Sequence, residues 1–248
     1  MEKYKSELEE LAKKCGLDIN SLGPEKYVLF DNFCTILSLK SERKDRELDK
    51  IINKNKYDSL TGLENRYALN DFLIRNTYRA DRHDEDLSIL MIDADNFKLY
   101  NDSYGHIQGD NALVTISHIV RNSIRKEDLA VRYGGEEISL VLPETSQEDA
   151  EGLAERIREK VEETIIPKNK SREFTNENYK HVTVSLGLFI YHRSLNEILG
   201  NKIEEGISLF NEKITDEDRV KALINEADMA LYKAKEDGRN RYCIANLE

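Results

Sequence analysis

The chain lacks several features that would point to particular classes of protein. It has no tryptophan, only three prolines and only three cysteines among 248 residues. Cys15, Cys34 and Cys243 form no C-x-x-C pair, so the usual cysteine patterns for zinc or redox chemistry are absent. No apolar run approaches the roughly 20 residues that cross a bilayer, and Met1 leads into a charged stretch rather than a signal peptide. The sequence therefore predicts a cytoplasmic protein without a membrane span.

Positive charge is also in deficit. The chain carries 37 Lys and Arg against 48 Asp and Glu, which gives a net charge of −11. A broad surface for nucleic acid or anionic membrane is excluded, because such surfaces neutralise phosphates with Lys and Arg. An anionic ligand would need a local basic cluster or a metal ion. With 39% hydrophobic and 34% charged residues, the composition is typical of a soluble globular protein with one sizeable core.

The first 56 residues have a helical pattern of their own. Apolar residues recur at helical spacing over 3–15, and a second helix is predicted over about 28–57, apolar in its first half and charged in its second. This stretch is short for an independent sensor domain. It could pair with a second copy as a short coiled coil or pack on the main domain. We expect an N-terminal helical segment at 1–56, regulatory or dimerising, and a main domain at 57–248.

From residue 57 onward, helical and strand patterns alternate. Buried strands are predicted at 87–95 and 181–191, a hairpin at 129–145 and a short strand at 240–245. The hairpin turn contains Gly134 and Gly135, for which we expect a primed turn with positive φ. Helices are predicted at 66–80, 96–106, 110–128, 146–164 and 225–239. This order indicates an α+β fold of split β-α-β-β-α-β, ferredoxin-like plan, with helices covering a largely antiparallel sheet.

Acidic residues gather where two predicted strands end. Asp93 and Asp95 close the first strand, and Glu136 and Glu137 follow the two glycines of the hairpin. If these ends meet, several carboxylates share one rim, where two ionised groups at about 4 Å repel by roughly 4 kcal/mol at an effective dielectric of about 20. An oxygen-only cluster suits Mg²⁺ or Mn²⁺, and Mg²⁺ is commonly shared with substrate phosphates, which predicts a nucleoside triphosphate substrate.

Each of these features also has a purely structural explanation. Gly-Gly is an ordinary hairpin turn, and a Glu pair is unremarkable in so acidic a chain. Asp93 could cap the end of its strand, and Asp110 could cap the helix that follows it. The basic residues near the C-terminus could simply lie on a solvated helix end.

The order and spacing of five segments resemble the GGDEF family of diguanylate cyclases. The segments are DSLTGLENR at 58–66, DADNFKLYNDSYGHIQGDNAL at 93–113, RYGGEEI at 132–138, VSLG at 184–187 and ADMALYKAKEDGRN at 227–240. The resemblance spans nearly all of 57–248 and implies a palm-like fold that binds one GTP. Two facing domains would each present a 3′-hydroxyl to the α-phosphorus of the other GTP, forming cyclic di-GMP and two pyrophosphates. A homodimer, at least transient, is therefore implied.

Two other functions remain open. A degenerate domain of this family could act only as a receptor for GTP or cyclic di-GMP and signal through a protein partner. The second is another palm-type nucleotidyl transferase or cyclase that acts on ATP, against which Asn101 and Asp110 speak. The intact set of acidic and basic motif residues favours the cyclase.

The resemblance assigns metal ligands and a catalytic group. Asp93 and Glu137 would be the metal carboxylates, together with the backbone carbonyl of Ala94, and the metal would be Mg²⁺ or Mn²⁺. Glu136 would either lie by the attacking hydroxyl or help to hold a second metal ion. The ions would lower the pKa of the hydroxyl and offset phosphate charge.

The resemblance also assigns the nucleotide contacts. Asn101 and Asp110 match the guanine-reading pair, and a carboxylate can accept hydrogen bonds from N1–H and the exocyclic amine of guanine, which favours GTP over ATP. The phosphates would lie at the start of a helix, where free amides favour negative charge, and against basic side chains that project from one face of the last helix. The phosphate-binding residues would be Asn96, Phe97, Lys98, Lys235 and Arg239.

A second site for the product is suggested by an R-x-x-D motif. Arg125 and Asp128, with Arg156 on the next helix, match the inhibitory product site of the family, although such a motif also arises by chance in a highly charged chain. Ile138 stands where the family usually has Phe, and Ala94 where it usually has Ile. The segment 193–220 is longer than usual and is predicted to form an extra helix or a lid.

Overall fold

The computed structural model describes residues 56–166, 181–195 and 215–245. They belong to one compact unit, Lys56–Glu248. The expectations for 1–55, including the coiled coil, and for most of 193–220 lie outside the described residues. Within the described ranges, no helix combines the length and the apolar character needed to cross a membrane.

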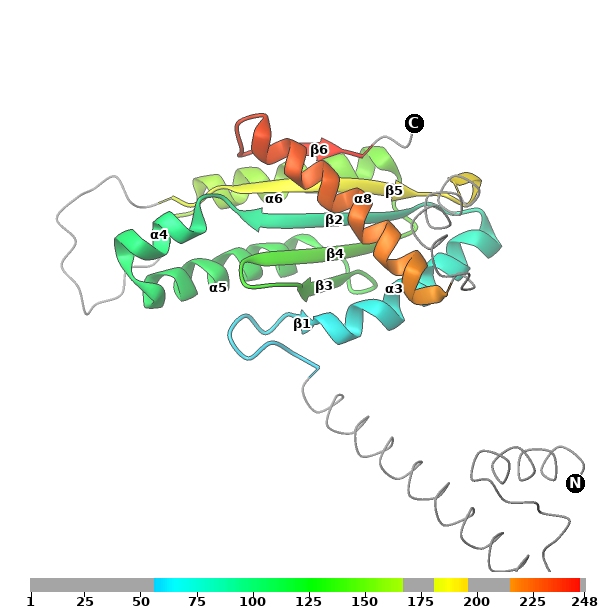
Figure 1. Ribbon diagram of the computed structural model, residues 1–248, viewed down its shortest axis with the longest axis horizontal. Coiled ribbons are helices and arrows are strands. Elements are labelled where there is room, and N and C mark those ends of the chain that lie inside the picture. Colours follow the sequence, from blue (N-terminus) through cyan, green and yellow to red (C-terminus); the bar gives the residue numbers. More distant parts are fainter. Residues whose placement is uncertain (1–55, 167–180, 196–214, 246–248) are drawn as a thin grey trace, which may run out of the picture. The chain divides into compact units, whose positions relative to one another are not determined.

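A six-stranded mixed sheet forms the centre of the unit (Figure 1). The strands β3, β4, β2 and β5 pair antiparallel in that order, and the two edge pairs, β1–β3 and β5–β6, are parallel. This arrangement confirms the predicted α+β fold with a largely antiparallel sheet. The strands are β1 (Glu64–Asn65), β2 (Leu87–Ala94), β3 (Leu129–Arg132), β4 (Glu137–Pro143), β5 (Val184–Tyr191) and β6 (Tyr242–Ile244).

Helices cover both faces of the sheet. The described helices are α3 (Arg66–His83), α4 (Phe97–Tyr104), α5 (His106–Ser123), α6 (Gln147–Glu163) and α8 (Asp216–Glu236), and Arg193–Leu195 form a 3₁₀ turn. One core lies between the sheet and α4, α5 and α6, and a second lies between the sheet and α3 and α8 (Figure 1). All of β2 is buried, because its even-numbered residues from Leu90 onward join the first core and its odd-numbered residues face the second. Asp93 therefore projects toward α8.

Several helix boundaries differ from those predicted. The helix α5 begins at His106 rather than at Asp110, because Gly105, with φ 84°, ends α4 and directly precedes α5. Asp110 is therefore not the N-cap, and that structural explanation is wrong. The same helix ends at Ser123, so the R-x-x-D motif lies in a turn. The helix α8 begins at Asp216, nine residues before the predicted start, because Thr215 and Asp218 form a capping box. The predicted cap at Ser146 is confirmed.

The position of α8 depends on one glycine in β5. A Cβ atom on Gly187 would collide with the backbone of α8 at the Ala227 carbonyl and the Leu231 amide. The helix backbone thus lies directly on the strand, closer than any side chain would permit. This contact sets how deeply α8 packs on the sheet, and α8 carries Asp228 and Lys235.

Candidate active site

Asp93 and Glu137 lie directly opposite each other. They are paired residues in the antiparallel ladder between β2 and β4, so their side chains project from the same face of the sheet. Asp93 is only 6% exposed, and Glu137 is half-buried. The strand end and the hairpin turn therefore do converge as the sequence indicates. Ala94, the last residue of β2, is paired with Val184 beside this point.

The hairpin turn is closed by the backbone of Glu137. Its carbonyl accepts hydrogen bonds from the amides of Tyr133 (2.9 Å) and Gly134 (3.3 Å). Neither glycine has a positive φ, so the predicted primed turn is wrong. A Cβ atom on Gly134 would instead collide with the Glu137 carboxylate, whereas one on Gly135 would meet nothing within 4 Å. Gly134 leaves room for the Glu137 carboxylate in its present position.

The turn is also hydrogen-bonded, through Arg132, to the segment at the start of the domain. Arg132 donates to the Gly135 carbonyl (2.7 and 3.2 Å) and to both carboxylate oxygens of Asp58 (3.1 Å each). Asp58 also accepts from the amide and the hydroxyl of Thr61. Burial acts to raise the pKa of Asp58, but the hydrogen bonds from Thr61 and the charge of Arg132 outweigh it and lower that pKa. The DSLTGL segment and the glycine turn therefore form one connected unit.

Lys235 lies against the paired carboxylates. Its Nζ atom is 2.9 Å from Asp93 Oδ1. The side chain of Lys235 is 32% exposed, whereas the side chain of Asp93 taken alone is 8% exposed. The lysine reaches this place from the last turn of α8, which packs over β5 and β2. The cation predicted from the sequence is thus at the strand end, and in this structure its direct partner is a carboxylate.

The three carboxyl groups near this point all resist ionisation. Burial raises the pKa of Asp93, Glu136 and Glu137, because it removes water from the charged form. The charge of Asp93 raises the pKa of both glutamates further, and Lys235 lowers all three values. A divalent cation would relieve this repulsion more strongly than one lysine can.

The donor set fits a magnesium-type ion shared with a substrate. Over the residues that the structure describes, no three His, Cys, Asp or Glu side chains are grouped as a preformed metal cage. Mg²⁺ does not need such a cage, since it is usually held by one or two carboxylates together with substrate phosphates. Two opposed carboxylates with a strand-end carbonyl beside them supply that number of protein ligands.

Asp95 does not belong to this rim, contrary to the expectation from the sequence. Its carboxylate accepts hydrogen bonds from the hydroxyls of Thr183 (2.7 Å) and Ser185 (2.6 Å) and from the backbone amide of Asn240 (3.0 Å). Both of its oxygens are therefore engaged, and the residue is buried. It links the end of β2 to β5 and to the segment after α8.

The helix α4 begins immediately after the strand that carries Asp93. Asn96 is its N-cap in a left-handed conformation, with no side-chain cap, and Phe97 is the first helical residue. Phe97 is buried and Lys98 is exposed. The amides of the first turn therefore lie next to the strand end, as the sequence predicts.

Asn101 and Asp110 come from two helices that approach closely. The Asn101 side chain on α4 packs against Gly109 of α5, where a Cβ atom would collide with Asn101 Oδ1. That buried oxygen has no hydrogen-bond partner among the described residues. A buried acceptor without a donor is costly, so a ligand donor would be favoured there. Asp110, the next residue on α5, is exposed.

Arg239 does not lie on the last helix, so the expected shared helix face with Lys235 is wrong. The helix α8 ends at Glu236, and Gly238, with φ 114°, turns the chain away. The Arg239 amide then donates to the Ala234 carbonyl (3.0 Å), a pattern typical of glycine-terminated helices. Arg239 is exposed and itself has a φ of 65°.

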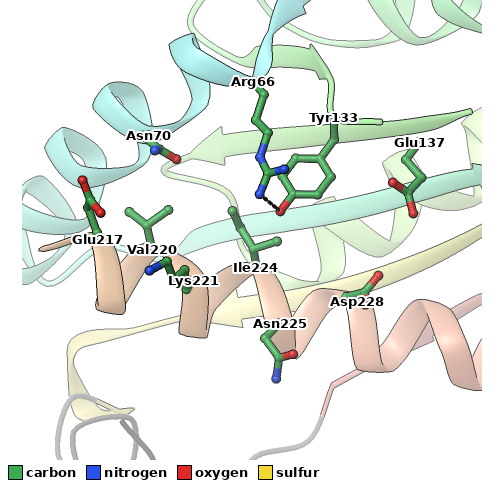
Figure 2. A pocket seen from close by; sticks show the side chains of 10 residues that line it. All are labelled: Arg66, Asn70, Tyr133, Glu137, Glu217, Val220, Lys221, Ile224, Asn225 and Asp228. Carbon is green, nitrogen blue, oxygen red and sulfur yellow. Dashed lines mark hydrogen bonds between the residues drawn. The ribbon is translucent and has the colours of Figure 1, made fainter. Parts of the chain in front are cut away.

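A pocket of about 280 Å³ adjoins the carboxylate pair. Figure 2 shows Glu137 and Asp228 at one end of it and Arg66 against Tyr133 above its apolar floor. Asp228 was not singled out from the sequence, yet its charge raises the pKa of both Asp93 and Glu137. Its spacing of two helical turns from Lys235 is the signal that could have identified it.

The R-x-x-D motif forms a turn at the end of α5. The Arg125 amide donates to Asp128 Oδ2 (2.7 Å), and Arg156 on α6 donates to the Ser123 carbonyl (3.2 Å). Burial raises the pKa of Asp128. The three predicted residues therefore gather around one helix end. The helices α5 and α6 pack on the opposite face of the sheet from α8, which separates this turn from the carboxylate pair.

Comparisons with known proteins show the family of this chain. A family model described as "Diguanylate cyclase, GGDEF domain" matches residues 55–205. Diguanylate cyclase A of Treponema denticola is 37% identical over 161 residues, which are 65% of this chain and 36% of that protein. Diguanylate cyclase TpbB of Pseudomonas aeruginosa is 31% identical over 243 residues, 97% of this chain and 48% of that protein.

A solved structure shares the fold. The coiled coil and GGDEF domain of DgcB from Caulobacter crescentus, in complex with c-di-GMP, matches with a TM-score of 0.64 at 26% identity, over 87% of this chain and 98% of that one. The chain spans only about a third to a half of the two curated relatives named above. Because the family model covers more than half of its length, the chain belongs to the GGDEF domain family of diguanylate cyclases.

Proposed function

We propose that the protein is a diguanylate cyclase that condenses two GTP into cyclic di-GMP and two pyrophosphates. The observation that carries this proposal is the direct pairing of Asp93 with Glu137, with Glu136 beside them in the turn. A domain that only senses a nucleotide has no need to bury and oppose two carboxylates whose pKa values are raised by doing so.

Asp93 and Glu137, with the Ala94 carbonyl, would hold Mg²⁺ or Mn²⁺. The bound ion would lower the pKa of the attacking 3′-hydroxyl and offset phosphate charge. Lys235, whose partner in this structure is Asp93, would contact the triphosphate when Asp93 serves as a metal ligand. Glu136, whose pKa is raised by burial and by Asp93, would accept the hydroxyl proton or help to hold a second ion.

The nucleotide would lie across the start of α4. The amides of Asn96, Phe97 and Lys98 and the Lys98 ammonium would face its phosphates, with Arg239 from the loop after α8. Asn101 Oδ1, buried and without a donor among the described residues, would accept from guanine. The exposed carboxylate of Asp110 would accept the other guanine N–H, a contact that adenine cannot offer.

One domain would supply one GTP, so the reaction would need two copies of the chain facing each other. Cyclic di-GMP would also bind at the turn of Arg125 and Asp128, near Arg156, as a feedback inhibitor. The solved relative DgcB was crystallised with c-di-GMP, which supports a product-binding surface in this family.

The test is to incubate the purified chain with GTP and Mg²⁺ and separate the nucleotides by chromatography. The cyclase forms cyclic di-GMP, and Asp93→Asn and Glu136→Ala form almost none. Binding of GTP or cyclic di-GMP without any product would instead support the receptor, and unchanged product in Glu136→Ala would defeat the role given to Glu136.

A further inference from the structure

Asp95 holds the segment that follows α8. Its Oδ2 atom accepts from the Asn240 amide (3.0 Å) and the Thr183 hydroxyl (2.7 Å), and its Oδ1 atom accepts from Ser185 (2.6 Å). Its own amide donates to the Thr183 carbonyl (2.8 Å). The residue is 8% exposed, so these bonds are shielded from competing water.

The segment that Asp95 holds has an unfavourable backbone conformation. Gly238, Arg239 and Asn240 follow one another with φ values of 114°, 65° and 48°. Glycine adopts positive φ freely and asparagine fairly easily, but arginine does not. Contacts from outside the segment must therefore keep Arg239 in this conformation.

Besides the bond from the Arg239 amide to Ala234, several of those contacts are made by Asn240, the residue after Arg239. Besides its amide bond to Asp95, Asn240 accepts from Arg158 Nη1 (3.1 Å) and donates from Nδ2 to Glu162 Oε1 (2.8 Å). Among these three partners, only Asp95 lies at the end of β2, one residue past Ala94 and two past Asp93. Through Asn240 and Asp95, the backbone at Arg239 is therefore held to the same strand end that carries Asp93.

We propose that Asp95 is a positioning residue that fixes Arg239 for contact with the triphosphate. It acts through the Asn240 amide, binds no metal and touches no substrate. This inference rests on the proposed function for the role of Arg239, but the claim that Asp95 holds the loop does not. The acidic residue that the sequence places on the rim would instead set the distance between the rim and the phosphate-binding loop.

Asp95→Ala and Asp95→Asn separate this role from a general effect of the carboxylate charge. Alanine removes every acceptor. Asparagine can keep them, because its amide oxygen can accept from Asn240 and Thr183 while its Nδ2 donates to the Ser185 hydroxyl, which can act as acceptor. Thr183→Val is a third, nearly isosteric variant that removes one bond to the same Oδ2 atom, for use if Asp95→Ala does not fold.

The first measurement needs no nucleotide. Trypsin cleavage of the full chain after Arg239 is followed by mass spectrometry. We expect cleavage about tenfold faster in Asp95→Ala, a smaller increase in Thr183→Val and the wild-type rate in Asp95→Asn, since a released loop fits a protease more easily. An unchanged rate in both Asp95→Ala and Thr183→Val overturns the proposal.

The second measurement is the affinity for 3′-deoxy-GTP with Mg²⁺ by calorimetry, because this nucleotide lacks the attacking hydroxyl. Asp95→Ala should weaken binding about tenfold in the wild-type background and less than about twofold in Arg239→Ala, since residues that act through one another are not additive. An equal loss in both backgrounds overturns the proposal. If the wild-type protein binds 3′-deoxy-GTP but makes no cyclic di-GMP, the proposed cyclase function is wrong, while the role given to Asp95 still stands.

Discussion

Lys235 Nζ lies 2.9 Å from Asp93 Oδ1, so a cation of the chain itself neutralises the buried carboxylate at the end of β2. Burial raises the pKa of Asp93, and Lys235 is the group that opposes this effect. The two residues come from segments 142 positions apart (235 − 93), yet the packing of α8 on Gly187 brings them together. Their contact couples α8 to the end of β2.

Removing that cation should move the acid limb of the pH–activity profile. In Lys235→Met the pKa of Asp93 rises further, and Asp93 must be ionised to bind a metal ion. We therefore expect the acid limb of kcat/KM to shift to higher pH, with activity at pH 7 lower by about tenfold or more. Lys233→Met makes the same charge change at an exposed position of α8 and serves as control. A limb that stays at its wild-type pH in Lys235→Met contradicts the pairing.

Neutralising Glu137 should stabilise the metal-free protein while it removes activity. Burial and the charges of Asp93 and Asp228 raise the pKa of Glu137 in the folded state. The folded protein then holds a proton more tightly than the unfolded chain, so wild-type stability falls as pH rises from the unfolded value of about 4.3 through the folded pKa. Glu137→Gln does not lose stability in this way, because a glutamine side chain does not ionise. We expect equal melting temperatures near pH 4 and a higher one for the variant at pH 7, without divalent ions; a lower one at pH 7 would refute the account.

Gly109→Ala should weaken GTP binding through Asn101. The added Cβ atom would collide with the Asn101 side chain and displace the acceptor proposed to read guanine. We expect KM for GTP to rise about tenfold, with a smaller change in kcat. Gly152→Ala on α6 is the matched control, since its Cβ meets nothing within 4 Å, and it should add about 0.5–1 kcal/mol of stability. Equal KM values for the two variants would count against the guanine contact.

Arg125→Ala should relieve product inhibition. The side chain is exposed in the turn that Asp128 closes, so the fold should tolerate the change. Initial rates measured without product should stay close to wild type, and the affinity for cyclic di-GMP should fall by about tenfold or more. Lys126→Ala removes a charge from the next residue and should leave both quantities unchanged. Inhibition that is unaltered in Arg125→Ala would exclude this site.

The sheet and the convergence of Asp93 with Glu137 were predictable because they follow from short-range patterns. A nearly continuous apolar run ending in Asp93 marks a buried strand, and a glycine turn followed by Glu137 marks its hairpin partner. Antiparallel pairing then places the two side chains on one face. The order and spacing of the motifs indicated the family, which the hydrophobic periodicity alone does not identify.

The partners of Asp95, Lys235 and Arg239 could not be read from the sequence. Asp95 and Asp93 look equivalent at the end of one strand, but Asp95 is bound by the hydroxyls of Thr183 and Ser185, about 90 residues away, and by a backbone amide still further along the chain. Helical spacing placed Arg239 with Lys235, but a positive φ at Gly238 ends the helix first. The partners of these residues are set by contacts between segments far apart in the sequence, and local sequence patterns carry no information about such contacts.

The binding of Mn²⁺ tests the central claim most directly, because this ion can be followed by electron paramagnetic resonance in the presence of 3′-deoxy-GTP. Mn²⁺ affinity is compared for the wild type, Asp93→Asn, Glu137→Gln and Asp102→Asn, the last being an exposed acidic residue of α4. The paired-carboxylate site predicts that Asp93→Asn and Glu137→Gln each lose about 100-fold in affinity, while Asp102→Asn binds like the wild type. Wild-type affinity in both Asp93→Asn and Glu137→Gln would contradict it.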